Sequence, residues 1–283
     1  LAVAWLLARG TDIERTTARS GASALYIAAT LGHFRCAELL CVGGAGVERK
    51  PPGREPPLIV ACEGGYVKCA RVLCNHGADG HRVIDRQTGT TVLLQAVTRG
   101  QTDIVRVLLD AGAVVDAGAV DETEDQQQTP LFVACSMGYS GCVKLLCDAD
   151  ADVDCENGEF FSTALHASCQ HQHAECVSIL IRARAMLNPE DDLRGYTPLM
   201  LACLKGDAEC TRLLIEAGAA KDIRSWDGAT ALPYASQMGH RPAVQMPCDA
   251  AADLSRGSGR GPVAFGSTPL HMAAHAGHVN LLP

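Results

Sequence analysis

A six-residue pattern recurs along the chain and constrains its fold more than any other feature of the sequence. Its clearest copy is TPLHMA at residues 268–273, where a threonine precedes a proline and a leucine, and an alanine follows three residues after the leucine. The same leucine returns at steps of 33 to 38 residues, a length that accommodates two short helices and a loop. These anchor leucines are Leu25, Leu58, Leu93, Leu131, Leu165, Leu199, Leu232 and Leu270.

Signals for the start and end of helices stand at fixed distances from the anchor leucines. Two residues before most of them stands a threonine, or Ser23 in the first copy, whose hydroxyl can cap a helix. Three residues after the anchor stands an alanine, with Ser168 as the one substitute, which suits helices that approach closely. Seven residues after the anchor stands a glycine in nearly every copy, and glycine favours the left-handed conformation that ends a helix.

This spacing and this hexad together resemble the ankyrin repeat family, whose unit is a turn followed by two antiparallel helices. The resemblance covers nearly the whole chain and implies an all-α fold, an ankyrin-repeat solenoid of stacked helix-turn-helix units with projecting hairpin loops. Because both ends of the sequence fall inside second helices, we expect a fragment of a longer chain. The expected segments are a truncated first repeat with only its second helix (1–15), then repeats 1 to 8 at 16–48, 49–82, 83–116, 117–155 with a long acidic hairpin, 156–188, 189–222, 223–255 (degenerate) and 256–283 (incomplete).

Several positions depart from the family's pattern. Gln172 replaces the glycine between two helices, and Asp150, Arg184 and Ala251 stand where a glycine is preferred after the second helix. Pro247 falls inside an expected second helix, where proline costs about 3 kcal/mol. We therefore expect the stack to loosen around residues 240–265, which include the linker-like segment GSGRG.

Charge and motifs exclude several classes of function. The net charge of −8 and the lack of a lysine or arginine block would repel a polyanion, so we expect no nucleic-acid partner. No stretch approaches the roughly 20 apolar residues that span a bilayer, so we expect no membrane contact within this segment. Motifs for nucleotide binding, zinc proteases, kinases and serine hydrolases are missing, so we expect no enzyme and no cofactor.

The fourteen cysteines raise the alternative of a metal site, because Cys169, His171, His173 and Cys176 form a CxHxHxxC motif. The repeat register favours another interpretation. Thirteen cysteines fall on three positions that recur with the unit, where other copies have alanine, valine, isoleucine or leucine, and only Cys155 falls in a hairpin. Cysteine at such positions behaves as a small buried hydrophobe. We expect no metal, no structural disulfides, and a reducing compartment, cytoplasmic or nuclear.

The resemblance also implies where a protein partner lies, namely across the hairpin tips and the exposed residues of the first helices. The corresponding register comprises positions six, five and three residues before each anchor leucine and five and six after it. Exposed aromatic residues are enriched at interaction hot spots, although each ring has the alternative of folding back onto the neighbouring hairpin. The candidates are Phe160, Tyr196 and Trp226, with Phe161 and Phe265 on hairpins of the same row, the charged Arg194 and Asp227, and the apolar Leu31, Met137, Leu204 and Met238.

We therefore predict a monomeric scaffold or adaptor that binds one or more proteins and has no catalytic activity. An alternative is a regulatory ankyrin domain of a larger enzyme or channel whose effector part lies outside this sequence. A third hypothesis is an intrinsic hydrolase, which an activity screen would distinguish from the other two.

Overall fold

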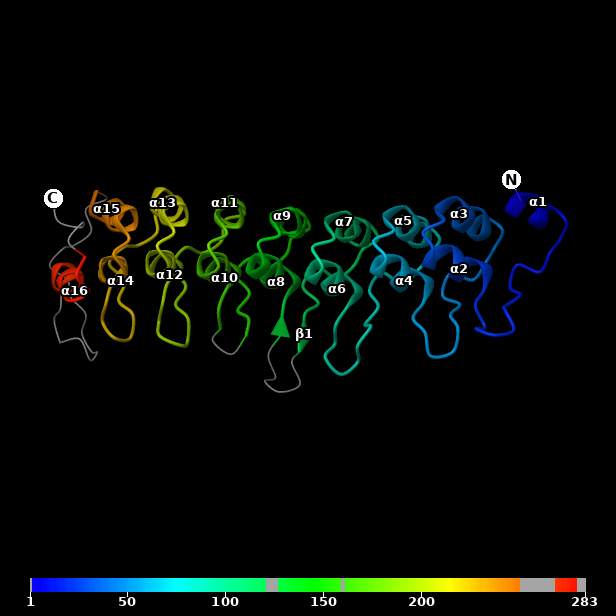
Figure 1. Cartoon of the computed structure of the whole chain (residues 1–283), viewed down its shortest axis with the longest axis horizontal. Helices are drawn as coiled ribbons and strands as arrows, with labels where there is room; N and C mark the ends of the chain where they lie inside the picture. Colours follow the sequence, from blue (N-terminus) through cyan, green and yellow to red (C-terminus); the bar gives the residue numbers. More distant parts are fainter. Residues whose placement is uncertain (1, 121–126, 159–160, 250–267, 279–283) are drawn as a thin grey trace. The chain divides into compact units, whose positions relative to one another are not determined.

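A computed structural model describes residues 2–120, 127–158, 161–249 and 268–278. The chain divides into two compact units, residues 1–123 and 124–283. Both units are built from pairs of short helices joined by loops (Figure 1). None of the described helices is long and apolar enough to cross a membrane.

The described residues of the first unit, 2–120, form one single helix and three helix pairs. Its first helices α2, α4 and α6 pack in one row, and its second helices α3, α5 and α7 pack in another, with α1 against α3 (Figure 1). The elements are α1 (Ala2–Ala8), α2 (Ala24–Thr30), α3 (Phe34–Val42), α4 (Pro57–Glu63), α5 (Val67–Asn75), α6 (Val92–Thr98), α7 (Thr102–Asp110) and the two-residue strand β1 (Ala119–Val120).

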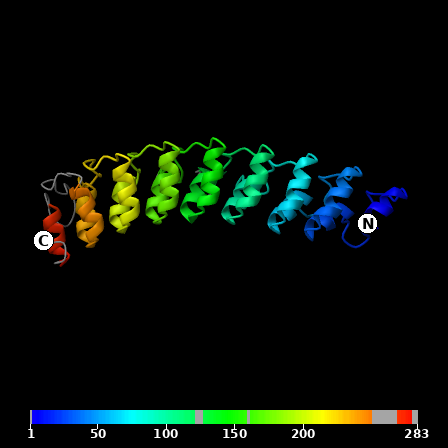
Figure 2. The ribbon, with the colours of Figure 1, turned by 90° about the horizontal axis from the view of Figure 1, so that it is seen from above.

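The second unit continues the same architecture. Helices α8, α10, α12, α14 and α16 form its first-helix row, and α9, α11, α13 and α15 form its second-helix row. Seen from above, neighbouring pairs of this unit lie side by side (Figure 2). The elements are the strand β2 (Gln127–Gln128), α8 (Pro130–Met137), α9 (Ser140–Asp148), α10 (Ala164–Gln170), α11 (Ala174–Arg182), α12 (Pro198–Lys205), α13 (Ala208–Glu216), α14 (Ala231–Met238), α15 (Arg241–Asp249) and α16 (Pro269–His275).

The repeated hexad starts the first helices and fills their core. The hydroxyl of Thr129 accepts a hydrogen bond from the backbone N–H of Phe132 at 3.3 Å, and Thr197 caps α12 in the same way. Seven of the eight anchor leucines are at most 2% exposed. Leu270 is the exception at 61%, because no described helix follows α16 to cover it. The predicted all-α solenoid of stacked helix pairs is confirmed.

A close contact between neighbouring repeats explains one glycine of the pattern. The ring of His173, which precedes α11, lies over Gly138, where an added Cβ would be only 2.6 Å from the ring. The His173 Nε2 atom lies 3.2 Å from the carbonyl oxygen of Ser136, to which it can donate. Glycine is therefore needed at this position both for its left-handed backbone, with φ at 73°, and for its missing side chain.

The departures from glycine keep the left-handed backbone. Gln172, Asp150 and Arg184 have φ values of 62°, 60° and 65°. The neighbour explains why Gln172 is tolerated. The next repeat places Asp207 where four other repeats place a histidine and two place a tyrosine. The Asp207 carboxylate turns to its own helix and accepts from the backbone N–H groups of Glu209 and Cys210, at 3.0 and 3.1 Å.

Pro247 does not interrupt its helix. Helix α15 runs through it from Arg241 to Asp249 and packs against α13 and α14. Ala251 and most of the segment 240–265 lie outside the described residues, so the expected loosening stays a prediction.

Candidate partner-binding groove

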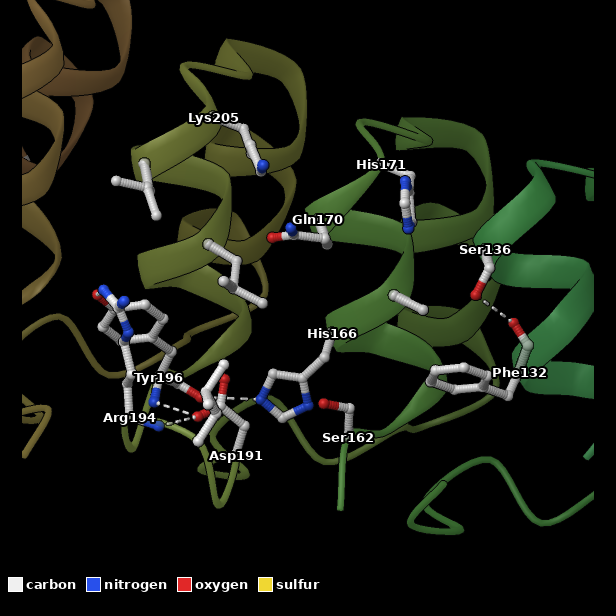
Figure 3. A pocket seen from close by; sticks show the side chains of 14 residues that line it. Phe132, Ser136, Ser162, His166, Gln170, His171, Asp191, Arg194, Tyr196 and Lys205 are labelled. Atoms are coloured by element: carbon white, nitrogen blue, oxygen red, sulfur yellow. Dashed lines mark hydrogen bonds between the residues drawn. The ribbon is translucent and has the colours of Figure 1, made fainter. Parts of the chain in front are cut away.

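A cavity of about 440 Å³ opens on the first-helix row of the second unit, between α8, α10 and α12 (Figure 3). Ser162, just before α10, and residues of the hairpin before α12 line its lower side in this view. Its lining combines apolar side chains with several polar and charged ones, as is typical of binding sites in proteins. This cavity and its rim are called the groove below.

Three consecutive repeats supply the groove, and they do so largely from the register that the sequence pattern marked. That register brings side chains from the ends of the first helices and from the hairpin tips to one face, because equivalent positions of stacked repeats lie side by side. The register positions that line the groove are Ser136, Ser162, Gln170, His171, Leu193, Arg194, Tyr196, Leu204 and Lys205.

The hairpin before α12 is organised by the carboxylate of Asp191, which is only 6% exposed. Its Oδ1 atom accepts from the backbone N–H groups of Arg194 and Tyr196, at 2.8 and 3.1 Å. The backbone N–H of Asp191 in turn donates to the carbonyl oxygen of Tyr196 at 3.0 Å. Such an aspartate turn fixes the loop from within and holds the Arg194 side chain at the rim of the groove.

The imidazole of His166 ties α10 to this hairpin. Its Nδ1 atom accepts from the backbone N–H of Thr163 at 3.1 Å, which leaves the proton on Nε2. Nε2 then donates to the carbonyl oxygen of Tyr196 at 2.9 Å. Burial lowers the pKa of His166, so the ring is neutral at pH 7. Both ring nitrogens thus serve the structure, and neither remains for proton transfer.

The structure corrects the expectation that Tyr196 presents its ring on the surface. The residue is only 7% exposed, and its ring meets that of Tyr234 edge to face at a centroid distance of 5.1 Å. A guanidinium N–H of Arg194 donates to the Tyr196 hydroxyl at 3.3 Å. Tyr196 therefore follows the alternative in which the ring folds back onto the neighbouring repeat, because the ring of Tyr234 there gives it an aromatic surface to pack against.

Trp226 lies at the tip of the next hairpin, as expected, and is 59% exposed. Its indole lies over Gly195, and its backbone N–H donates to the carbonyl oxygen of Arg194 at 2.9 Å. Together with Leu193, which is 48% exposed, it borders a second hollow of about 310 Å³ next to the groove. The two side chains form an apolar rim, called the Leu193–Trp226 rim below.

Asp227 lines the same hollow but is engaged in its own hairpin. Its Oδ1 atom accepts from the Tyr234 hydroxyl at 2.8 Å and from the backbone N–H of Ala229 at 3.1 Å. Partial burial raises the pKa of Asp227, but hydrogen bonds from Ser225 and Tyr234 outweigh it and bring the pKa below its usual range. Asp227 is therefore an ionised structural residue of this tip.

The remaining candidates are dispersed. Phe161 is 47% exposed and has a φ of 48°, a strained conformation for an aromatic residue. Met137 and Met238 are exposed but do not line the groove, and Leu31 is exposed in the first unit. Phe160 and Phe265 lie outside the described residues.

Sequence reasoning missed several residues of the groove. Leu193, His171 and Lys205 stand at positions of the marked register, so the repeat pattern could have identified them. They were left out because the candidates chosen from the sequence were mainly aromatic residues of the hairpins and apolar residues of the helices. Asp191 stands outside the register, and His166 occupies a repeated scaffold position. Only their hydrogen bonds show that they shape the site.

The CxHxHxxC motif is not arranged as a metal site. Cys169 and Cys176 are buried, His171 is exposed, and His173 is directed to the Ser136 carbonyl. Within the described part of the chain, no three histidine, cysteine or acidic side chains are placed to hold a metal ion. Burial raises the pKa of Cys176 to about 11, which keeps it a protonated thiol at neutral pH.

The stacked helix pairs and the lateral groove define an α-helical repeat protein. Family models for ankyrin repeats match residues 1–84, 80–157, 153–225 and 183–258, and a single ankyrin repeat model matches 265–282. The chain therefore belongs to the ankyrin repeat family.

Comparisons with individual proteins agree with this assignment. The crystal structure of the human ASB11 ankyrin repeat domain is similar with a TM-score of 0.61 and 26% identity, over 82% of this chain and 99% of that one. "Ankyrin repeat and KH domain-containing protein mask-1" of Caenorhabditis elegans is 29% identical over 132 residues, 47% of this chain. The protein mask of Drosophila melanogaster, with the same domains in its name, is 38% identical over 71 residues, 25% of this chain. The matches span only 5% and 2% of these two long relatives.

Proposed function

We propose that the second unit is a protein-interaction module of a scaffold or adaptor that binds a segment of a partner protein in the groove. The observation that carries this proposal is the meeting of register positions from three consecutive repeats at one cavity of about 440 Å³. The exposed Leu193–Trp226 rim beside it adds apolar surface, and exposed aromatic residues with a neighbouring pocket are typical of interaction hot spots.

The groove is suited to binding because its walls are held in place from within. Asp191 fixes the hairpin before α12, and His166 joins that hairpin to α10 through a bond of 2.9 Å. The anchor leucines of α8, α10 and α12 are at most 1% exposed. A preorganised surface loses little conformational entropy when a partner binds, which favours affinity.

Binding, without catalysis, is the chemistry that the groove supports. Of the two histidines in its lining, His166 uses both nitrogens for structural hydrogen bonds, and His171 is exposed to solvent at one end. The groove is also open to water, whereas stabilisation of a transition state by fixed dipoles needs a dry site. We accordingly assign the groove a holding role.

The test is quantitative capture of partner proteins with a variant whose groove is blocked. Leu204→Glu places a negatively charged side chain in the groove, and Trp226→Ser removes the exposed indole. We expect the double variant to lose the specific partners of the unaltered chain, with the same helical circular dichroism spectrum. Val42→Ser, which changes a 73% exposed apolar residue of α3 in the first unit, is the matched control and should retain them. Equal capture by the groove variant and the unaltered chain would exclude the groove as the binding site.

We also propose a reducing compartment, cytoplasmic or nuclear, for this chain. Cysteines fill repeated core positions, and burial raises the pKa of the Cys62 thiol to about 12 and of the Cys41 thiol to about 11. Protein isolated from its source under alkylating conditions should show fourteen reactive thiols after denaturation. Recovery of stable disulfides would place it in an oxidising compartment instead.

A further inference from the structure

The groove carries positive charge at both of its ends. Figure 3 shows Lys205 near Gln170 and His171 at one end, and Arg194 beside Tyr196 and Asp191 at the other. None of the ion pairs found among the described residues includes Lys205 or Arg194. One Arg194 N–H donates to the neutral Tyr196 hydroxyl at 3.3 Å, which leaves the positive charge of both side chains to a ligand, on a chain whose net charge is −8.

The one carboxylate in the lining does not cancel this charge for a ligand. Asp191 is 6% exposed, and the backbone N–H groups of Arg194 and Tyr196 already donate to it. Arg194 is exposed and Lys205 is half-buried. Asp227, which lines the neighbouring hollow with Arg194, accepts hydrogen bonds from Ala229 and Tyr234 of its own repeat. A ligand in the groove therefore meets the two cations, while both carboxylates are engaged in their own hairpins.

An apolar surface separates the two ends. Leu201 and Leu204 of α12 and Phe132 of α8 line the groove between the charged groups. Leu201 is 7% exposed, and Leu204 and Phe132 are half-buried, so each side chain leaves part of its surface to a ligand. An apolar side chain inserted here would be removed from water on several sides.

The distance between the cations sets the spacing that a ligand must match. Arg194 precedes α12 and Lys205 ends it. At a rise of about 1.5 Å per residue, this eight-residue helix spans roughly 12 Å, which separates Lys205 along its axis from the hairpin that holds Arg194. An extended peptide covers that distance with about three to four residues.

From these observations we propose that the groove binds an acidic segment of a partner protein, in which an apolar side chain lies between two carboxylates about four residues apart. One carboxylate pairs with Lys205 beside His171, the other pairs with the Arg194 guanidinium, and the apolar side chain contacts Leu201 and Leu204. This inference rests on the proposed function and specifies its ligand.

A protein segment fits better than a nucleic acid. Nucleic acids are held by rows of cations that neutralise successive phosphates. The groove offers two cations separated by leucines, and the chain as a whole is acidic. Binding of a nucleic acid is therefore an outcome that the test must exclude.

The test is selection from a random library of displayed peptides of roughly twelve residues, long enough to span the groove. The chain with residues 1–283 is the bait, and peptides are eluted and sequenced. We expect enriched peptides to share two acidic residues around a leucine, isoleucine, methionine or phenylalanine. Enrichment of basic or uncharged peptides that still require Leu204 would overturn this inference but leave the proposed function intact. Enrichment that is unchanged by Leu204→Glu, which blocks the groove and repels carboxylates, would overturn both.

Charge reversal then assigns the pairing. Lys205→Glu should lower the affinity for the selected peptide by about tenfold or more, as measured by fluorescence polarisation. A peptide in which the matching acidic residue is changed to lysine should recover part of the lost affinity. Lys144→Glu is the matched control, because it makes the same charge change on the second-helix row, where Lys144 pairs with Asp148. Equal effects of the two variants, or rescue of neither, would refute the assignment.

Two further measurements distinguish peptide binding from a structural role of Lys205 and from binding of a nucleic acid. Lys205 ends α12, so a merely structural role would appear as a lower denaturation midpoint of Lys205→Glu with unchanged peptide affinity. A labelled single-stranded oligonucleotide that competes with the peptide for the groove would contradict the choice of an acidic protein segment.

Discussion

The contact between Gly138 and His173 allows a sharp test of how neighbouring repeats are joined. Gly138→Ala adds a methyl group at a φ of 73°, where the new Cβ would lie 2.6 Å from the imidazole of the next repeat. An L-residue in this conformation costs roughly 1–2 kcal/mol by itself. The imidazole must also move and give up its contact with the Ser136 carbonyl at 3.2 Å, worth about 0.5–1.5 kcal/mol.

We therefore expect Gly138→Ala to lower the free energy of unfolding of the second unit by about 1.5–3.5 kcal/mol. In a His173→Ala background the ring is gone, and only the backbone cost of about 1–2 kcal/mol should remain. The matched control is Gly158→Ala, where φ is 71° and nothing lies within 4 Å of the added Cβ. It should show the backbone cost alone.

Urea denaturation followed by circular dichroism measures all four variants, and the double-mutant cycle isolates the coupling between the two positions. A coupling of about 0.5–1.5 kcal/mol is expected from the lost hydrogen bond and the steric contact. Additive effects of Gly138→Ala and His173→Ala would refute the argument that the ring requires the glycine.

Three further perturbations test other parts of the fold. Arg184→Gly relieves a left-handed conformation, with φ at 65°, that costs roughly 1–2 kcal/mol, but the glycine loses about 0.5–1 kcal/mol more backbone entropy on folding. Urea denaturation should therefore show a free energy of unfolding that is higher by about 0.5–1 kcal/mol. A lower free energy of unfolding would contradict the strain at Arg184. Leu165→Ala removes an anchor leucine with no exposed surface and should cost about 2–5 kcal/mol, whereas a cost below that range would show that the core can collapse around it. Burial lowers the pKa of His166 below its usual 6.5, so the unfolded chain takes up the proton first, and stability should fall as pH drops below about 6.5. The slope of unfolding free energy against pH from 7.5 to 5 should be smaller in His166→Gln, and equal slopes would show that another group is responsible.

The sequence predicts most positions of the candidate site, but it does not predict how their side chains are oriented. Arg194, Leu204 and Trp226 lie on the groove or its rim because repeated positions of stacked units come to one face. Tyr196 shares that register and is nevertheless buried, because Tyr234 of the following repeat receives its ring. Such a contact joins residues of two repeats, and no pattern within one repeat contains it.

The sequence by itself determined that this chain forms stacked helix pairs. A threonine cap, a leucine anchor and a helix-ending glycine act within one repeat, and nearly every copy contains these same residues. Tertiary structure alone decided which side chains meet across the repeats. Asp191 turned into its own hairpin, His166 bonded to the next one, and Lys205 and Arg194 came to opposite ends of a leucine-lined groove. These contacts depend on side chains that differ from one repeat to the next. Their orientations are determined only when neighbouring repeats pack together.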